Sequence, residues 1–136
     1  MPTPPILVET DGPVRTIIIN RPDKRNAVDR PTADALRDAF QAFEEDDSVS
    51  VAVLTGAGGN FCAGADLSEG AKTFDYDARA DSGEAGRTNK EDIQRDGGGR
   101  VTLRIFESLK PVIGAINGAA VGIGVTMQLP MDIRIA

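Results

Sequence analysis

Residues 51–67 read V-A-V-L-T-G-A-G-G-N-F-C-A-G-A-D-L, and the rest of the chain is arranged around them. The run from Val51 to Thr55 is apolar and rich in β-branched residues, which predicts a buried strand. Glycines then end the strand, small residues follow, and Asp66 stands where it could cap a helix. Small residues between a strand and a helix let a ligand approach the backbone, whose free N–H groups can donate to it. The stretch therefore predicts a site for an anion, either a permanent one or one that forms during a reaction.

A second stretch, residues 112–127, has the same design of buried strand, glycine turn and helix start. Each stretch would present backbone N–H groups at the start of its helix. Two such donors directed at one oxygen would form an oxyanion hole. The alternative is that both stretches only serve tight packing of a strand against a helix, and the pattern alone does not separate the two.

The composition is typical of a globular protein of one domain, with 136 residues, 40% apolar and 26% charged. A net charge of −6 argues against nucleic acid or an anionic membrane as the main partner. No apolar run is long enough to cross a bilayer, and the N-terminus, M-P-T-P-P-I-L-V, lacks the features of a signal peptide. We therefore expect a cytoplasmic protein.

The chain contains no histidine and a single cysteine, Cys62. This excludes Ser-His-Asp and Cys-His mechanisms within the chain, an intrachain disulfide, and a histidine or thiolate metal site. We expect no metal. Cys62 is interpreted as a packed small side chain rather than a nucleophile, because no histidine could activate it.

The N-terminal part predicts a β-hairpin followed by an amphipathic helix. Residues 6–10 and 14–20 are β-prone and flank the turn Asp11-Gly12-Pro13. Asp29 can cap a helix that has Pro31 in its first turn. Apolar residues at helical spacing predict one core-facing side of this helix: Ala33, Leu36, Ala39, Phe40 and Phe43.

The C-terminal part predicts a continued α/β alternation. Residues 68–100 are charged, end in three glycines and are interpreted as a mobile insertion, either a lid beside the site or a solvated loop. We expect a helix over residues 100–109, a strand over 112–116, a short helix from Gly122 to about Leu129 and a strand over 131–135. The pattern stops within an α/β alternation, so we expect residues 1–136 alone to need further polypeptide.

A dinucleotide-binding site is the competing interpretation of the second glycine turn. Gly118-x-x-x-Gly122-Ile-Gly124 is similar to the glycine-rich turn of short-chain dehydrogenases. However, that turn should open the first βαβ unit and be followed by an acidic residue about 20 positions on. The only tyrosine, Tyr76, also lacks a lysine four residues later, and no Gly-Lys-Ser/Thr sequence indicates a P-loop.

Four segments in order resemble the N-terminal half of the enoyl-CoA hydratase/isomerase (crotonase) superfamily. They are Asn20-Arg21-Pro22 leading to Asn26-Ala27, Val51–Thr55, Phe61–Leu67, and Lys110-Pro111-Val112 through Asn117-Gly118 to Asp132. The resemblance implies a crotonase-like α/β fold over residues 1–136, a spiral of ββα units that lacks its C-terminal part. It also implies acyl-CoA substrates, no cofactor besides the coenzyme A thioester itself, and a homotrimer or dimer of trimers.

The resemblance also implies roles for individual residues. The two oxyanion donors fall on the backbone N–H groups of Ala65 and Ile123. Further positions fall on substrate- or CoA-binding residues of the family: Lys24, Arg25, Ala27, Ala63, Gly64, Asp66, Leu67 and Gly122. Lys24 and Arg25 match a region near the CoA phosphates, although an exposed basic pair also suits a solvated turn. For Asp66 a helix cap is preferred over a catalytic base.

Thr126 departs from the family pattern. Hydratases of the family use two glutamates, the first of which falls at position 126, and the second is expected beyond Ala136. The resemblance therefore supports polarisation of a thioester carbonyl toward an enolate and leaves hydration, isomerisation and other acyl-CoA reactions open. The alternative from another class is a non-catalytic CoA-binding or assembly fragment.

Overall fold

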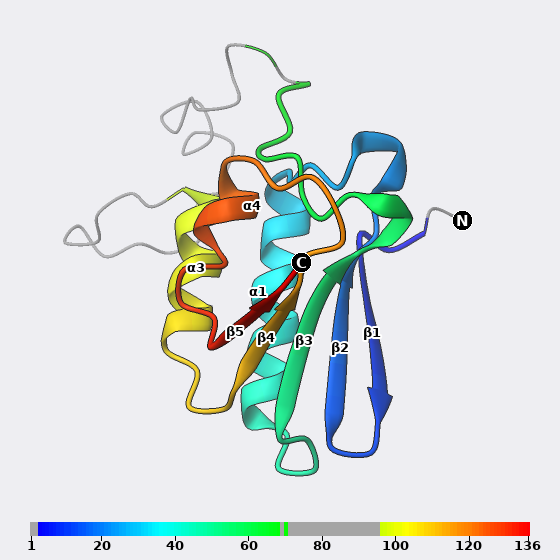
Figure 1. Cartoon of the computed structure of the whole chain (residues 1–136). Helices are drawn as coiled ribbons and strands as arrows, with labels where there is room; N and C mark the ends of the chain where they lie inside the picture. The colour runs from blue at the N-terminus through cyan, green and yellow to red at the C-terminus, as the bar shows by residue number, and fades with distance from the viewer. Residues whose placement is uncertain (1–2, 69, 71–95) are drawn as a thin grey trace, which may run out of the picture.

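The protein is a mixed α/β structure built on one five-stranded sheet, seen in a computed structural model that describes residues 3–68, 70 and 96–136 (Figure 1). The strands are β1 (Ile6–Asp11), β2 (Val14–Ile19), β3 (Val51–Gly56), β4 (Val112–Ala115) and β5 (Ile133–Ile135). They lie side by side in chain order; β1 and β2 form an antiparallel hairpin, and each later pair is parallel. The predicted α/β class is therefore confirmed.

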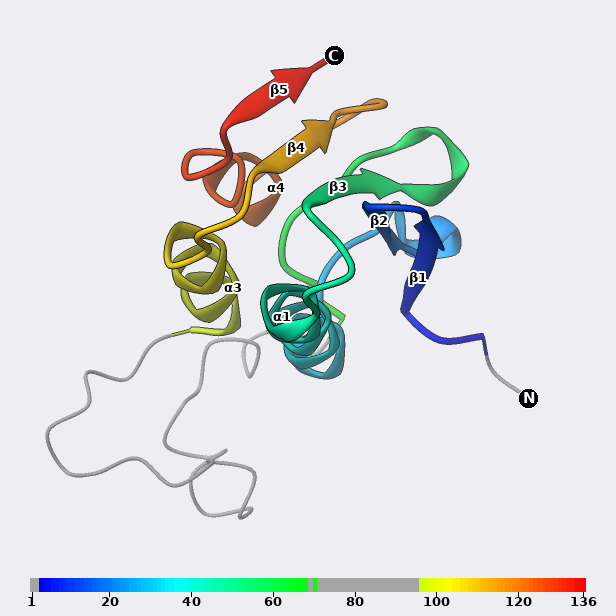
Figure 2. The ribbon, with the colours of Figure 1, turned by 90° about the horizontal axis from the view of Figure 1, so that it is seen from below.

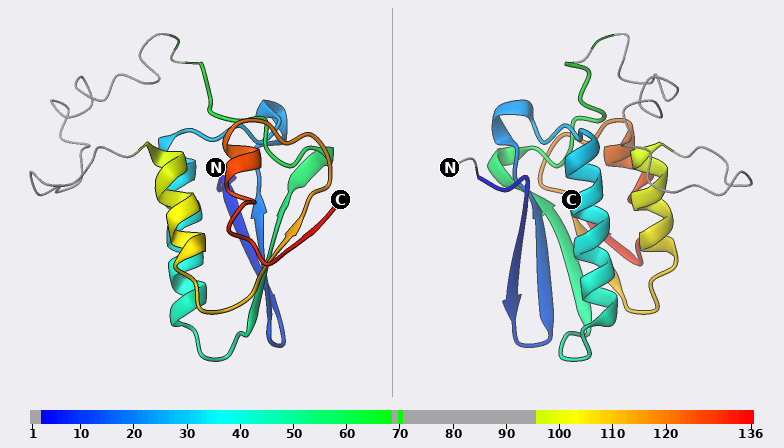
Figure 3. Two further views of the ribbon diagram at one scale, coloured as in Figure 1. Left: turned by 60° about the vertical axis from the view of Figure 1, so that its left-hand side comes forward. Right: turned by 180° about the vertical axis from the view of Figure 1, so that it is seen from behind.

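The helices connect the parallel strands. They are α1 (Arg30–Glu45), α3 (Gly97–Phe106) and α4 (Ile123–Thr126), with short 3-10 turns η1 (Pro22–Lys24) and η2 (Ala57–Gly59). Figures 2 and 3 show α1, α3 and α4 on the same side of the sheet. No helix within the described ranges is long and apolar enough to cross a membrane.

Helix α1 begins where the sequence predicts, because Asp29 caps it. The Asp29 carboxylate accepts from the backbone N–H of Thr32 over 2.9 Å, and Pro31 occupies the first turn. At the other end, Lys110 Nζ donates to the carbonyl oxygens of Phe43 and Asp46 over 2.9 and 2.7 Å. This cation offsets the unfavourable acidic run at the helix C-terminus.

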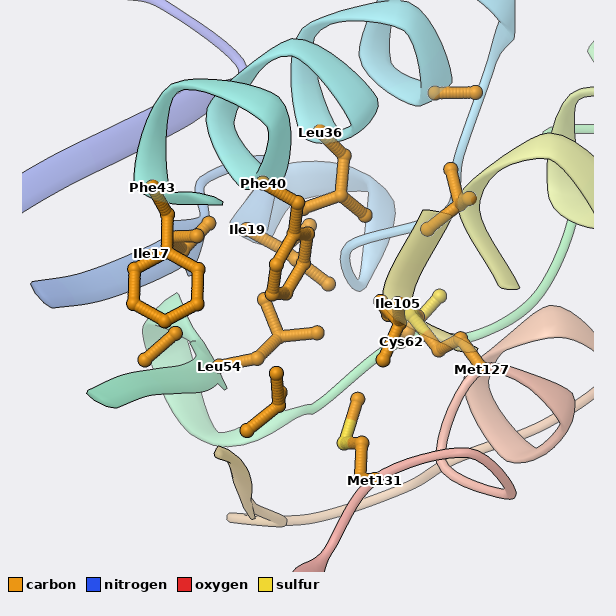
Figure 4. Packing of buried hydrophobic residues seen from close by; sticks show 14 of the residues in the cluster. Ile17, Ile19, Leu36, Phe40, Phe43, Leu54, Cys62, Ile105, Met127 and Met131 are labelled. Carbon is orange, nitrogen blue, oxygen red and sulfur yellow. The ribbon is translucent and has the colours of Figure 1, made fainter. Parts of the chain in front are cut away.

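The core lies between this helical layer and the sheet. Figure 4 shows side chains of α1 and β2 packed together with Leu54, Ile105 and Met127. Among the aromatic rings of the described residues, those of Phe40, Phe43 and Phe61 are fully buried. Along β2 and β3 alternate residues are buried, as expected for strands covered by helices on one face.

Helix α3 begins three residues earlier than the expected Arg100, so three glycines form its first turn. Asp96 caps the helix by accepting from the N–H of Gly99 over 2.6 Å. The first two glycines let α3 pack closely: a Cβ on Gly97 would lie 3.1 Å from Cβ of Ala33, and one on Gly98 would lie 2.9 Å from Cδ1 of Ile123. The expected insertion at 68–100 therefore ends before Gly97, and most of it lies outside the described residues.

Helix α4 is shorter than expected and ends at Thr126 instead of about Leu129. The chain continues in tight turns, in which the N–H of Gln128 donates to Val125 and that of Leu129 to Thr126. Strand β5 likewise begins at Ile133, two residues later than expected. Before it, Asp132 is already tied to β4, since its carboxylate accepts from the N–H of Val112 over 2.8 Å.

Candidate functional site

The two predicted glycine turns follow neighbouring parallel strands, β3 and β4, and therefore leave the sheet at the same edge. This edge, beyond the carboxyl ends of the strands, is where ligands bind in open α/β sheets. Past the turns, the chain pairs again through a short parallel bridge between Cys62 and Ala120. The N–H of Cys62 donates to the Ala119 carbonyl over 3.0 Å, and the N–H of Val121 donates to the Cys62 carbonyl over 3.0 Å.

The bridge brings the two candidate donors into equivalent positions, since Ala65 and Ile123 each lie three residues beyond their bridge residue. Direct contact between the segments continues beyond the bridge. A Cβ on Gly64 would lie 3.3 Å from the carbonyl oxygen of Val121. A side chain on Gly124 would overlap the carbonyl of Cys62, so only glycine fits there.

Within the described residues, neither the N–H of Ala65 nor that of Ile123 donates a hydrogen bond. A second parallel bridge pairs Ala65 with Val28, whose N–H donates to the Gly64 carbonyl over 2.8 Å and whose carbonyl accepts from the Asp66 N–H over 2.9 Å. This ladder pattern leaves the N–H of Ala65 pointing away from Val28. Ile123 is the first residue of α4, and a first helical N–H has no partner within its helix.

A glycine with positive φ precedes each donor: Gly64 has a φ of 105° and Gly122 a φ of 56°. Other residue types avoid this backbone region because of their Cβ atom. The glycines therefore let the peptide that follows turn its N–H out of the local ladder. Both glycines are among the ligand-binding positions that the family resemblance implies, and their positive φ values explain why glycine occupies them.

Two asparagines hold the turns in place, and the sequence reasoning did not assign them this role. Asn26 is fully buried; its Nδ2 donates to the carbonyls of Ala57 and Asn60, each over 2.8 Å. The Asn117 side-chain amide bonds both backbone groups of Gly56 at the end of β3. Its Oδ1 accepts from the Gly56 N–H over 3.2 Å, and its Nδ2 donates to the Gly56 carbonyl over 2.6 Å. Asn117 stands directly before Gly118, so the sequence offered a local signal for it, whereas Asn26 is 31 and 34 residues from its partners and offered none.

Asp66 is an ion-pair partner. Its Oδ2 accepts from Nη2 of Arg21 over 2.9 Å, and its Oδ1 accepts from the N–H of Ser68 over 2.9 Å. The Ser68 hydroxyl and backbone N–H, together with the Arg21 guanidinium, lower the pKa of Asp66 to about 2. A carboxylate with this pKa is a poor base at neutral pH. The bond to Ser68 is one that a helix cap makes, and the residues that would continue such a helix lie outside those described.

The remaining candidate residues differ in how far they are exposed to solvent. Lys24 and Arg25 are exposed, and the Arg25 carbonyl accepts from the N–H of Ala63 over 3.1 Å. Leu67 is exposed, and Thr126 is exposed with its hydroxyl directed back at the Ile123 carbonyl over 3.5 Å. Ala27, by contrast, is half-buried, and its carbonyl accepts from Nη1 of Arg21 over 2.5 Å.

Cys62 is fully buried among core residues, and burial raises the pKa of its thiol. Both observations favour a packing role over a nucleophilic one. In the described part of the chain, no three acidic or cysteine side chains gather as a metal site would require.

Comparison with known proteins places this geometry in context. Residues 9–136 match the family model described as enoyl-CoA hydratase/isomerase. Enoyl-CoA hydratase AKT3-2 of Alternaria alternata is 42% identical over 133 residues, which cover 95% of this chain and 40% of the relative. The protein described as probable enoyl-CoA hydratase EchA14 of Mycobacterium tuberculosis is 39% identical over 139 residues, 97% of this chain and 46% of the relative.

Solved structures show the same relationship. The crystal structure of enoyl-CoA hydratase from Bacillus anthracis superposes with a TM-score of 0.78 at 29% identity, over 98% of this chain and 47% of the other. The chain thus spans less than half the length of the curated relatives it matches. The crotonase-like fold implied by the resemblance is confirmed for the N-terminal portion.

Proposed function

The chain belongs to the enoyl-CoA hydratase/isomerase family, and on this premise we propose that the protein processes acyl-CoA thioesters by stabilising an enolate in a backbone oxyanion hole. The N–H groups of Ala65 and Ile123 are the donors. The observation that carries the proposal is that these two N–H groups, each preceded by a positive-φ glycine, make no hydrogen bond to any described residue and lie on segments that touch.

The chemistry requires donors at the thioester oxygen. When a proton leaves the α-carbon or a nucleophile adds to the β-carbon, negative charge develops on the carbonyl oxygen. Donors that are already in place stabilise this charge without reorganising, and removing one such donor typically lowers turnover about 10²–10³-fold. Backbone donors suit this task because their direction is set by the fold.

Proton transfer needs a different group. The carboxylate of Asp66 is engaged by Arg21 and has a pKa of about 2, and the hydroxyl of Thr126 is a very poor base at neutral pH. The proton acceptor is therefore supplied from outside segments 63–67 and 121–126. With threonine at position 126, isomerisation or another one-carboxylate reaction is favoured over hydration.

The CoA moiety is proposed to lie along the exposed loop of Lys24 and Arg25 and the neighbouring backbone. Its contacts are the family positions Ala27, Ala63, Gly64, Asp66, Leu67 and Gly122. The Arg25 carbonyl bond to the Ala63 N–H supports this, because it places the basic loop beside the donor segment. The assembly is proposed to be a homotrimer or a dimer of trimers, as the family resemblance implies.

A non-catalytic CoA-binding or assembly role is the second candidate. It is favoured by one observation: in the described donor segments, Asp66 is paired with Arg21 and has a pKa of about 2, and Thr126 offers only a hydroxyl, so neither side chain is an effective base. The dinucleotide-binding interpretation is replaced by the family match over residues 9–136.

One experiment separates these roles. Butyryl-CoA labelled with ¹³C at the carbonyl cannot be hydrated, so its carbonyl stretch can be recorded by infrared difference spectroscopy while it is bound to the purified protein. An oxyanion hole lowers this frequency, because hydrogen bonds weaken the C=O bond. Binding with a lowered frequency, together with turnover of an enoyl-CoA, supports the proposal. Binding with an unchanged frequency and no turnover supports a non-catalytic CoA-binding role.

A further inference from the structure

Arg21 lies just beyond β2, and its backbone is held on both sides by Asn26. The N–H of Arg21 donates to Oδ1 of Asn26 over 2.8 Å, and the carbonyl of Arg21 accepts from the Asn26 N–H over 2.8 Å. Asn26 is fully buried. The guanidinium of Arg21 therefore extends from a fixed stretch of backbone.

The guanidinium of Arg21 donates hydrogen bonds to both segments of the short bridge between Val28 and Ala65. Its Nη1 donates to the carbonyl of Ala27, the residue before Val28, over 2.5 Å. Its Nη2 donates to Oδ2 of Asp66, the residue after Ala65, over 2.9 Å. Because the guanidinium is planar and rigid, these two bonds set the spacing and the relative rotation of the two strands.

The ion pair between Arg21 and Asp66 is largely shielded from solvent. The Arg21 side chain is 17% exposed and that of Asp66 is 9% exposed. A pair at this depth is screened by salt less than a surface pair. Asp29 contributes further, since its Oδ2 lies 3.4 Å from Nη2 of Arg21 while its Oδ1 caps α1.

We propose that Arg21 is a positioning residue of the site: by bonding the Ala27 carbonyl and the Asp66 carboxylate together, it directs the N–H of Ala65 at the thioester carbonyl oxygen. The inference rests on the proposed function and deepens it. It assigns to Arg21 an effect on the transition state through Ala65, without contact between Arg21 and the substrate.

The chain offers a matched control. Arg15 Nη2 lies 2.8 Å from Oδ2 of Asp46, and its side chain is 13% exposed. This pair likewise joins the β2 region to a distant segment, but Arg15 lies near the start of β2 and Asp46 is the C-cap of α1. Arg15→Lys and Arg21→Lys both keep the positive charge and remove the planar fork.

The experiment compares the two lysine variants with the wild-type protein. Arg21→Lys should lower kcat about 10- to 100-fold with little change in KM, as expected when a donor is misplaced. It should also return the carbonyl stretch of bound ¹³C-labelled butyryl-CoA toward the free value. Arg15→Lys should lower the unfolding midpoint to a similar extent and leave kcat and the carbonyl stretch unchanged.

The outcomes distinguish the two proposals. An unshifted carbonyl in the wild-type protein overturns the oxyanion hole and this inference with it. A shifted carbonyl that Arg21→Lys leaves unchanged, at unchanged kcat, overturns only the role of Arg21. If Arg21→Lys does not fold, Asp66→Asn tests the same Arg21–Asp66 contact, because asparagine keeps the shape of the aspartate side chain and removes its negative charge. If neither folds while Arg15→Lys does, the role of the pair is in the fold as a whole, and the inference is wrong.

Discussion

Gly64 and Gly122 lie against each other across the site: a Cβ on Gly122 would stand 3.6 Å from Cα of Gly64. Both have positive φ, and each precedes a backbone N–H that makes no hydrogen bond among the described residues. The two donor segments therefore pack on each other at ordinary van der Waals distance. The distance between the donors is thereby set by main-chain packing and not by a flexible side chain.

The first prediction removes one donor. Ile123→Pro deletes the N–H at the first residue of α4, where proline is tolerated. If the hole operates, turnover of an enoyl-CoA should fall about 10²–10³-fold. Ile123→Ala is the control, because it shortens the same side chain, which packs on Gly98, and keeps the N–H. Equal turnover in the two folded variants would argue against a role for this donor.

The second prediction concerns the glycine before the other donor. Gly64→Ala should destabilise the protein by about 1–3 kcal/mol, because alanine is strained at a φ of 105°. The new Cβ would also press on the Val121 carbonyl at 3.3 Å, so kcat should fall as well. Gly12→Ala, with a φ of 55° and nothing within 4 Å, carries strain without the contact. Denaturant unfolding and steady-state kinetics on both variants check this; loss of kcat in Gly12→Ala as well would remove the link to the site.

The third prediction concerns the reaction type and rests on Thr126. With threonine in place of a hydratase glutamate, the protein should hydrate crotonyl-CoA slowly and isomerise a 3-enoyl-CoA faster. The measurement compares the two rates at equal protein concentration. Thr126→Ala is the paired variant, and fast hydration that it leaves untouched would show that this position does not determine the chemistry.

The fourth prediction concerns acid stability. The pKa of Asp66 is lowered from 3.8 to about 2 in the folded protein, so folding favours its charged form. Its contribution to stability is therefore complete above pH 3.8 and is lost as the pH falls toward 2. Asp66→Asn cannot ionise, so its urea midpoint should fall less steeply between these pH values than that of the wild type. Parallel midpoint curves would contradict the assignment.

Local chemistry made several elements predictable. The cap at Asp29, the proline in the first turn and the apolar stripe ending at Phe43 predict α1 correctly, because each acts within a few residues. Alternation and β-branching likewise predict the strands to within one or two residues. The start of α3 was wrong because glycine is a poor helix former. There the Asp96 carboxylate caps the helix, and Gly97 and Gly98 lie close to Ala33 and Ile123.

From the sequence, the glycine turns predict two backbone donors, and the family resemblance assigns them to Ala65 and Ile123, an assignment that stays a prediction. The side-chain contacts that hold these segments in place could not be predicted from the sequence. Arg21 and Asp66 are 45 residues apart, and Asn117 and Gly56 are 61 apart. No local preference pairs such residues, since each pair forms only when the parallel strands have been aligned. The sequence by itself thus determined the strands, the caps and the glycines, which depend on short-range sterics. Only the tertiary structure decided that Gly64 packs against Gly122 and that Arg21 bonds both segments of the bridge between Val28 and Ala65, because these contacts depend on how distant segments pack.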